Sequence, residues 1–239
     1  MMECGSCRDC LHKLCAHKIP VFASLNREEM AHLSSIARHR NYGKGENLVS
    51  EGDPLDALVI LNEGDAKAYQ LTPDGHEQIL YVFSQGDFFG ERNLLGNRTS
   101  PYTVTALKPV KTCIFGRDAF HDMLRANPEI AVKIIEELES RMERMENALQ
   151  NMGVRNLDER IGGLLLDFSE KYGAKVPEGI LLRLPLSREG IARYLGVARE
   201  TVSRKLGQLE KDGVIRSVSN KSILILNGEA LKTAVGKEN

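Results

Sequence analysis

The chain has 239 residues, of which 42% are hydrophobic and 27% charged, with a formal net charge of −1, and this is the composition of an ordinary soluble globular protein. No apolar run approaches the length of a membrane span, and the start Met-Met-Glu-Cys has no signal-peptide pattern, so we expect a cytoplasmic protein with no membrane partner and no structural disulfides. The length exceeds the usual size of one domain and predicts two.

The net charge hides an asymmetry between the two ends of the chain. Residues 155–239 hold 15 Lys and Arg against 11 Asp and Glu, a net of +4, whereas residues 1–154 hold 17 against 22, a net of −5. A basic C-terminal part on an acidic body favours a local site for a polyanion over a surface that coats nucleic acid throughout.

Four of the five cysteines lie within residues 1–18, in the pattern Cys-x2-Cys-x2-Cys-x4-Cys formed by Cys4, Cys7, Cys10 and Cys15. In a cytosolic chain this density indicates metal binding or redox chemistry rather than packing. Four thiolates suit a tetrahedral zinc site or a cubane iron–sulfur cluster, and the repeated two-residue gaps favour the cluster because one short loop can wrap several irons. Zinc and a disulfide or thiol switch are the alternatives at this point.

The next stretch changes from a helical pattern to a strand pattern. Apolar spacing over residues 19–38 predicts a helix with Asn26 as its N-cap. Over residues 41–117, short apolar runs alternate with Gly-Asp turns, which predicts an all-β barrel or double-sheet roll. The fifth cysteine, Cys113, falls inside the strand predicted over 110–115. It is either a small buried apolar residue or, given the N-terminal cysteines, a distant fourth ligand.

A strict seven-residue repeat of apolar residues runs through 128–153. This period predicts a helix that pairs with another helix along a narrow seam, beginning at Pro128 and ending at Gly153. We interpret the flanking charged residues, Arg141 among them, as solvated or interchain charges. The alternative is an amphipathic helix that lies on its own domain. The residues assigned to dimerisation are Ile135, Leu138, Met142, Met145 and Leu149.

Residues 154–239 carry the sharpest motif of the chain. After a predicted helix over 156–172, Ser187 opens a helix that ends at the turn Gly196-Val197-Ala198, and a second helix runs over 199–209. This is the pattern of a helix-turn-helix. A predicted β-hairpin over 212–226 follows it as a wing.

The second helix begins with side chains suited to reading DNA. Its first residues share one face by their spacing, and the N-terminal end of a recognition helix is the part that reaches base edges. Arginine can bind guanine, glutamate can accept from cytosine, and lysine suits phosphates. A solvated charged face is the alternative, but the turn glycine, the core pattern, the basic balance and the wing together favour double-stranded DNA as the partner. The residues assigned to DNA contact are Arg199, Glu200, Ser203, Arg204 and Lys205, and of the lysines we assign Lys205, Lys211 and Lys221 to phosphates.

With the run Glu-Thr-Val-Ser-Arg at 200–204 and the Gly-Asp turns, nearly the whole chain resembles the CRP/FNR superfamily of bacterial transcription regulators. The resemblance implies an α+β fold with an N-terminal double-stranded β-roll of the cyclic-nucleotide-binding jelly-roll type. It divides the chain into a cysteine-rich segment (1–18), the roll (19–127), a dimerisation helix (128–153) and a winged helix-turn-helix domain (154–239). It also implies a homodimer that binds palindromic promoter sites and contacts RNA polymerase. No catalytic motif stands out, so we expect no enzyme.

The cyclic-nucleotide binders of this family follow Phe-Gly-Glu with an Arg-Ser or Arg-Thr pair that holds the phosphate. Here Phe89-Gly90-Glu91 is present, but the stretch that should carry the arginine reads Ser-Pro-Tyr-Thr-Val at 100–104, and Arg98 lies two residues too early. A phosphate pocket without its bidentate cation loses its main anchor, so we expect that cAMP does not bind.

The oxygen-sensing FNR branch carries an N-terminal cysteine cluster and one cysteine in the roll. By similarity, Cys7, Cys10 and Cys15 match the first set and Cys113 the distant ligand, which implies a 4Fe-4S cluster that supports DNA binding by the dimer and is degraded by oxygen. The gap from Cys10 to Cys15 is one residue shorter than in the best-known members, and Cys4 is an alternative ligand. Arginine at position 199 is usual in the cAMP receptor, which leaves TTGAT-type and TGTGA-like half-sites open.

We therefore predict an oxygen- or redox-responsive transcription regulator that senses through a cysteine-ligated 4Fe-4S cluster. One alternative is the same regulator with another effector, either zinc or a small ligand in the β-roll. An alternative from another class is an electron carrier whose N-terminal cysteines bind a ferredoxin-like cluster, and the helix-turn-helix counts against it.

Overall fold

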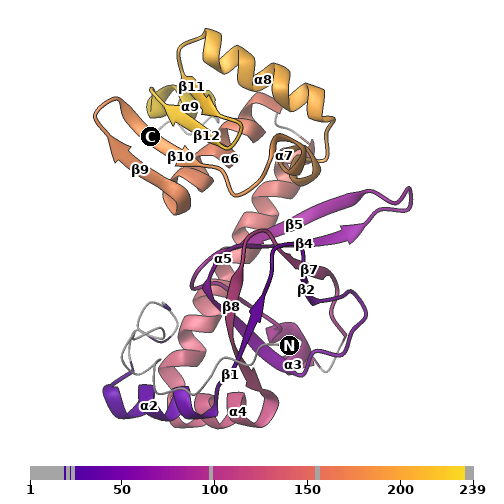
Figure 1. The fold of residues 1–239 in the computed structure, drawn as a ribbon, viewed down its shortest axis with the longest axis vertical. Helices are drawn as coiled ribbons and strands as arrows, with labels where there is room; N and C mark the ends of the chain where they lie inside the picture. Colours follow the sequence, from indigo (N-terminus) through magenta and orange to yellow (C-terminus); the bar gives the residue numbers. More distant parts are fainter. Residues whose placement is uncertain (1–18, 20–21, 23–24, 97–98, 154–156, 235–239) are drawn as a thin grey trace. The chain divides into compact units, whose positions relative to one another are not determined.

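The computed structural model describes residues 19, 22, 25–96, 99–153 and 157–234 (Figure 1). The chain divides into two compact units, Met1–His76 with Leu80–Met142, and Glu77–Ile79 with Glu143–Asn239. Among the described residues, no helix is long and apolar enough to cross a membrane. The mixture of strands and helices confirms the predicted α+β fold.

Two four-stranded sheets form the roll, with the strand orders β1-β8-β3-β6 and β2-β7-β4-β5 (Figure 1). The double-sheet roll predicted over 41–117 is therefore confirmed. The strands are β1 (Arg38–Tyr42), β2 (Asn47–Val49), β3 (Ala57–Glu63), β4 (Ala66–Leu71), β5 (Glu77–Phe83), β6 (Phe88–Phe89), β7 (Thr103–Ala106) and β8 (Val110–Gly116).

Apolar side chains from both sheets share one core, so the two sheets face each other. Leu61 of β3, Phe89 of β6 and Val104 of β7 belong to this inner core. Because side chains alternate along a strand, Ile60 of β3 and Cys113 of β8 lie on the opposite face of their sheet, which we call the outer face.

Helices and the start of the described chain cover the outer face. Residues of α2 (Arg27–Ile36), α4 (Arg117–Ala126) and the first part of α5 (Pro128–Gly153) join Ile60 and Cys113 in a second apolar core, which also contains Ile19 and Phe22. Between the strands, α3 (Glu91–Gly96) follows the Phe-Gly-Glu motif.

The helix predicted over 19–38 is shorter in the structure. Asn26 is its N-cap as predicted, since its side chain accepts hydrogen bonds from the amides of Glu28 and Glu29 in a capping box, and this fixes the start of α2 at Arg27. From Arg38 the backbone instead pairs with β8, so β1 replaces the last predicted turn.

The second unit carries the predicted helix-turn-helix and more strands than we predicted. A four-stranded sheet in the order β11-β12-β10-β9 contains the predicted wing, β11 and β12. In this unit β9, β10 and α9 were not anticipated, and neither were α3 and α4 of the first unit. The elements are α6 (Leu157–Tyr172), β9 (Gly173–Val176), β10 (Gly179–Arg183), α7 (Arg188–Leu195), α8 (Arg199–Lys211), β11 (Ile215–Ser219), β12 (Ser222–Ile225) and α9 (Gly228–Ala234).

Candidate functional site

The helix-turn-helix is fixed by local backbone chemistry. Ser187 is the N-cap of α7, and its hydroxyl accepts a hydrogen bond from the Gly190 amide at 3.1 Å. The helix ends at Gly196, whose φ of 66° is left-handed and favours glycine. Arg160 of α6 donates to the Leu195 carbonyl and so satisfies an acceptor at this helix end. The predicted turn between the two helices is confirmed.

One side of α8 is buried and the other is presented outward. Val202 and Leu206 are buried, as predicted for the core of the motif. Arg199, Glu200 and Arg204 are exposed, and Ser203 is half-buried. The structure therefore gathers these four predicted DNA-contact residues at the N-terminal end of one helix.

Lys205 lies in a different environment from the other predicted DNA residues. Its ammonium nitrogen is 2.7 Å from a carboxylate oxygen of Asp158 on α6. An ion pair at the surface is worth only about 0–1 kcal/mol, but it does neutralise the lysine that we assigned to a phosphate.

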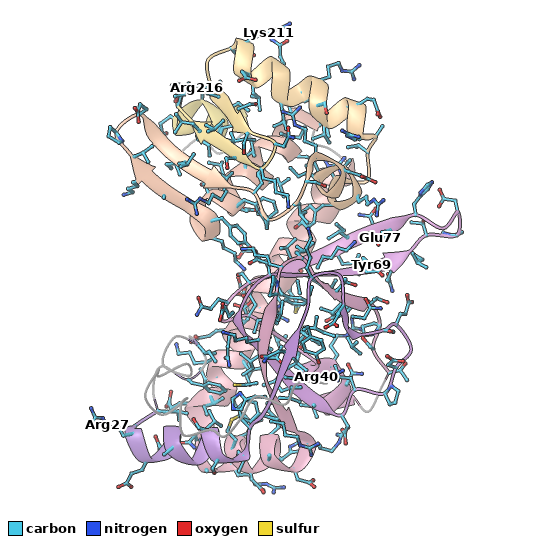
Figure 2. The ribbon with its side chains drawn as sticks, in the orientation of Figure 1. Arg27, Arg40, Tyr69, Glu77, Lys211 and Arg216 are labelled. Atoms are coloured by element: carbon cyan, nitrogen blue, oxygen red, sulfur yellow. The ribbon has the colours of Figure 1, made fainter. Side chains whose placement is uncertain are left out.

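The wing adds a cation that the sequence analysis missed. Lys211, at the end of α8, and Arg216, on β11, are both exposed (Figure 2). Arg216 follows the buried Ile215, and this inside–outside alternation along a strand is the signal that could have found it. Lys221, in the turn of the wing, is also exposed.

Cys113 is buried on the outer face of the roll, in the strand where it was predicted. The side-chain amide of Asn62, on β3, donates a hydrogen bond to its sulfur at 2.8 Å. His39 pairs directly opposite Cys113 on β1, and its Nδ1 lies 3.4 Å from the sulfur. Burial lowers the pKa of the His39 imidazole, which favours the neutral ring beside the sulfur.

The other predicted cluster ligands, Cys4, Cys7, Cys10 and Cys15, lie outside the described residues. Within the described ranges, no three His, Cys, Asp or Glu side chains are arranged to hold a metal ion. The chain that follows these cysteines does reach the outer face of the roll. Phe22 packs edge to face against Phe115, two residues beyond Cys113 on the same strand, with 5.9 Å between ring centroids.

Two apolar stripes run along α5, which has the predicted bounds 128–153. Ile130 and Ile134 are buried against the roll, and Leu138 packs partly against the same core. Ile135 and Met142 are 64% and 62% exposed, and their spacing of seven residues places them on one face of the helix. The helical backbone includes Met145 and Leu149, whose side chains are outside what the structure describes.

Arg141 is buried, which corrects our interpretation of it as a solvated or interchain charge. It turns from α5 into the roll, where its guanidinium lies 3.4 Å from the Glu91 carboxylate. The second nitrogen donates to the Phe88 carbonyl at 2.7 Å. Tertiary packing explains the error, because Glu91 on α3 and Phe88 on β6 lie 50 and 53 residues away in the sequence.

The Phe-Gly-Glu motif is held tightly by its surroundings. Gly90 has a φ of 98°, and a Cβ at this position would collide with the Ala57 carbonyl. Burial raises the pKa of the Glu91 carboxyl, while the positive charge of Arg141 acts in the opposite direction. Tyr102, in the stretch where cyclic-nucleotide binders carry their phosphate-binding pair, is buried and packs against Tyr81.

Comparison with known families agrees with this architecture. Residues 39–127 match the family described as Cyclic nucleotide-binding domain, and residues 159–234 match the Crp-like helix-turn-helix domain. The chain is 28% identical over 240 residues to the transcriptional activator protein FnrL of Cereibacter sphaeroides. The aligned residues make up 99% of this chain and 93% of that protein.

Two further proteins are similar over most of their length. The nitrogen fixation regulation protein FixK of Bradyrhizobium diazoefficiens is 31% identical to this chain over 209 residues. The aligned residues make up 87% of this chain and 85% of FixK. The solved structure of FixK2 from Bradyrhizobium japonicum superposes with a TM-score of 0.75 at 24% identity, covering 85% of this chain and 100% of that one. The last comparison supports the fold alone.

Proposed function

Because the chain belongs to the CRP/FNR superfamily of transcription regulators, which bind DNA as dimers and are not enzymes, we propose that it is an oxygen- or redox-responsive member of that family. It senses through a 4Fe-4S cluster held by Cys7, Cys10, Cys15 and Cys113, with Cys4 as an alternative ligand. It works in the cytoplasm, binds palindromic promoter sites and contacts RNA polymerase.

The placement of Cys113 is the observation that carries this proposal. Its sulfur lies on the outer face of the roll, in the same apolar core as Ile19 and Phe22. Cys15 is four residues before Ile19, and four residues of chain span at most about 14 Å, so the N-terminal thiolates can reach the face that holds Cys113.

The donor set at Cys113 also fits a cluster ligand. Thiolates are the usual ligands of iron–sulfur clusters, and hydrogen bonds to their sulfurs tune the bound cluster. The sulfur of Cys113 already receives an N–H from Asn62. When bound, the cluster supplies redox chemistry that oxygen can disturb, and the residues of the roll hold its ligand in place.

The same apolar core supports a route from the cluster to the dimer. Cys113 belongs to it together with Ile130 and Ile134 of α5, so a change at the sulfur reaches the base of the helix. Around that helix, Ile135 and Met142 present an exposed apolar stripe that a second copy can cover.

The DNA-reading part of the proposal rests on α8. Arg199, Glu200 and Arg204 are exposed at its N-terminal end, the part of a recognition helix that reaches base edges in the major groove. The buried Val202 and Leu206 fix the opposite side of the helix to its own domain, so these polar residues face outward.

Anaerobic purification tests the cluster directly. We expect about four iron and four sulfide per chain, and a brown visible spectrum that bleaches in air. Cys113→Ser should lose the spectrum and tight operator binding, whereas Cys4→Ser should retain both. A colourless protein loaded with zinc would overturn the proposal, and so would operator binding that is identical with and without the four ligands.

A further inference from the structure

Two strands place polar side chains beside a sulfur atom that the strand between them carries on the outer face of the roll. In the register of the sheet, Cys113 of β8 stands between His39 of β1 and Ile60 of β3. Asn62 comes two residues after Ile60 and donates to the sulfur at 2.8 Å, and His39 approaches to 3.4 Å from the other side.

A break in strand pairing aims Asn62 at the sulfur. Leu61 pairs with Thr112 and Glu63 with Lys111, so Asn62 is an extra residue between two consecutive partners on β8. This is a β-bulge, a feature that re-aims a side chain and often lies next to a functional site. The bulge therefore directs an amide toward Cys113 in a strand whose outward positions are otherwise apolar, as at Leu58 and Ile60.

The Asn62 amide is satisfied on one side only. Among the described residues its oxygen is buried without a hydrogen-bond partner, while its N–H group faces the sulfur. A buried acceptor without a partner costs about 1–3 kcal/mol, and a packed apolar side chain would avoid that cost. The unpaired oxygen is a cost that this position carries, and the contact that offsets it is the N–H group at the sulfur, which points to a role for that group.

We propose that Asn62 is a positioning residue for the Cys113 thiolate, and that with His39 it holds the fourth ligand of the cluster and tunes its reduction potential. The inference rests on the proposed iron–sulfur function. An N–H donor withdraws negative charge from a thiolate, which favours the more negative, reduced form of the cluster and raises its potential. It also holds the sulfur in one orientation, which slows loss of iron.

The test uses the full chain with its cluster, in four variants. Asn62→Leu removes the donor and keeps the size, and Asn62→Asp replaces the N–H group with a negative oxygen. His39→Phe keeps a ring and removes the nitrogens. Asn41→Leu is the matched control, because Asn41 is an exposed asparagine on β1.

Two readouts separate tuning from simple folding. We expect anaerobic iron release to a ferrous chelator to be about tenfold faster in Asn62→Leu, the range seen when partners of metal ligands are removed, and faster still in Asn62→Asp. The midpoint potential should become more negative in Asn62→Leu, with a smaller shift in His39→Phe and none in Asn41→Leu. A purely structural role would alter thermal unfolding of the apoprotein without moving the potential of the cluster.

The outcomes distinguish the two proposals. If the wild type binds a cluster that depends on Cys113, and Asn62→Leu matches it in potential and iron release, the role of Asn62 is overturned and the proposed function stands. A wild type that holds no iron and sulfide, or a Cys113→Ser variant with an unchanged cluster spectrum, overturns both.

Discussion

The guanidinium of Arg141, on α5, lies 3.4 Å from the carboxylate of Glu91, on α3, and both side chains are buried. Arg141 also stacks on the ring of Phe88, with 4.5 Å between its Cζ and the ring centroid. The Phe-Gly-Glu motif of the roll is thus bound to the middle of α5 within one chain.

Removing one partner of this pair should destabilise the protein strongly. Arg141→Leu leaves the Glu91 carboxylate buried without its cation, for which we expect a loss of about 3–5 kcal/mol in the free energy of unfolding, measured in urea. Arg125→Leu, which breaks the exposed Arg125–Asp122 pair, should cost no more than about 1 kcal/mol. Equal losses in the two variants would contradict the structural role of the pair.

The buried carboxyl of Glu91 predicts that the stability of the protein depends on pH. Burial raises the pKa of folded Glu91, so above the ordinary pKa of glutamate the unfolded chain releases this proton while the folded chain retains it. In that range the unfolded state binds fewer protons than the folded state. The stability that Glu91 contributes is therefore full at low pH and is lost as pH rises through the folded pKa of Glu91. We expect Glu91→Gln to flatten this part of the stability profile, and Glu51→Gln, on the surface, to leave it unchanged.

The exposed stripe on α5 predicts the site of self-association. Met142→Glu and Ile135→Glu place a charge on that stripe and should shift the protein toward monomer in sedimentation velocity. Ser140→Glu adds the same charge about half a turn away around the helix and should leave the dimer intact. A dimer that tolerates both stripe substitutions would place the contact elsewhere.

The Lys205–Asp158 pair predicts an unusual salt dependence of DNA binding. Because Asp158 already neutralises Lys205, we expect Lys205→Ala to leave the slope of log K against log salt nearly unchanged. Asp158→Asn should release the lysine for a phosphate and steepen the slope by about 0.9. A slope that becomes shallower by about one in Lys205→Ala would show that this lysine exchanges its carboxylate for DNA.

Two glycines of the helix-turn-helix should respond in opposite directions to the same change. Gly196→Ala forces a side chain into a left-handed conformation and should cost about 1–2 kcal/mol of stability. Gly207→Ala, inside α8 with open space around its Cβ position, should stabilise by about 1 kcal/mol. Thermal unfolding of the two variants, with the wild type between them, is the measurement.

The sequence by itself determined those parts of this protein that follow a short period or a local cap. The seven-residue repeat predicted α5, and Pro128 and Gly153 predicted its ends. Ser187 and Gly196 marked the start and end of α7, because each of these signals lies within a few residues of the structure it produces. The Gly-Asp turns between apolar runs likewise predicted the roll.

Only the tertiary structure decided which side chains meet. Arg141 finds Glu91 at a separation of 50 residues, Asn62 finds Cys113 at 51, and Lys205 finds Asp158 at 47. No periodicity encodes these pairs, because they depend on sheet register, on a bulge, and on which of the two apolar stripes of α5 its own roll covers. Burial then changes what each charge does, and the residue type alone does not reveal burial.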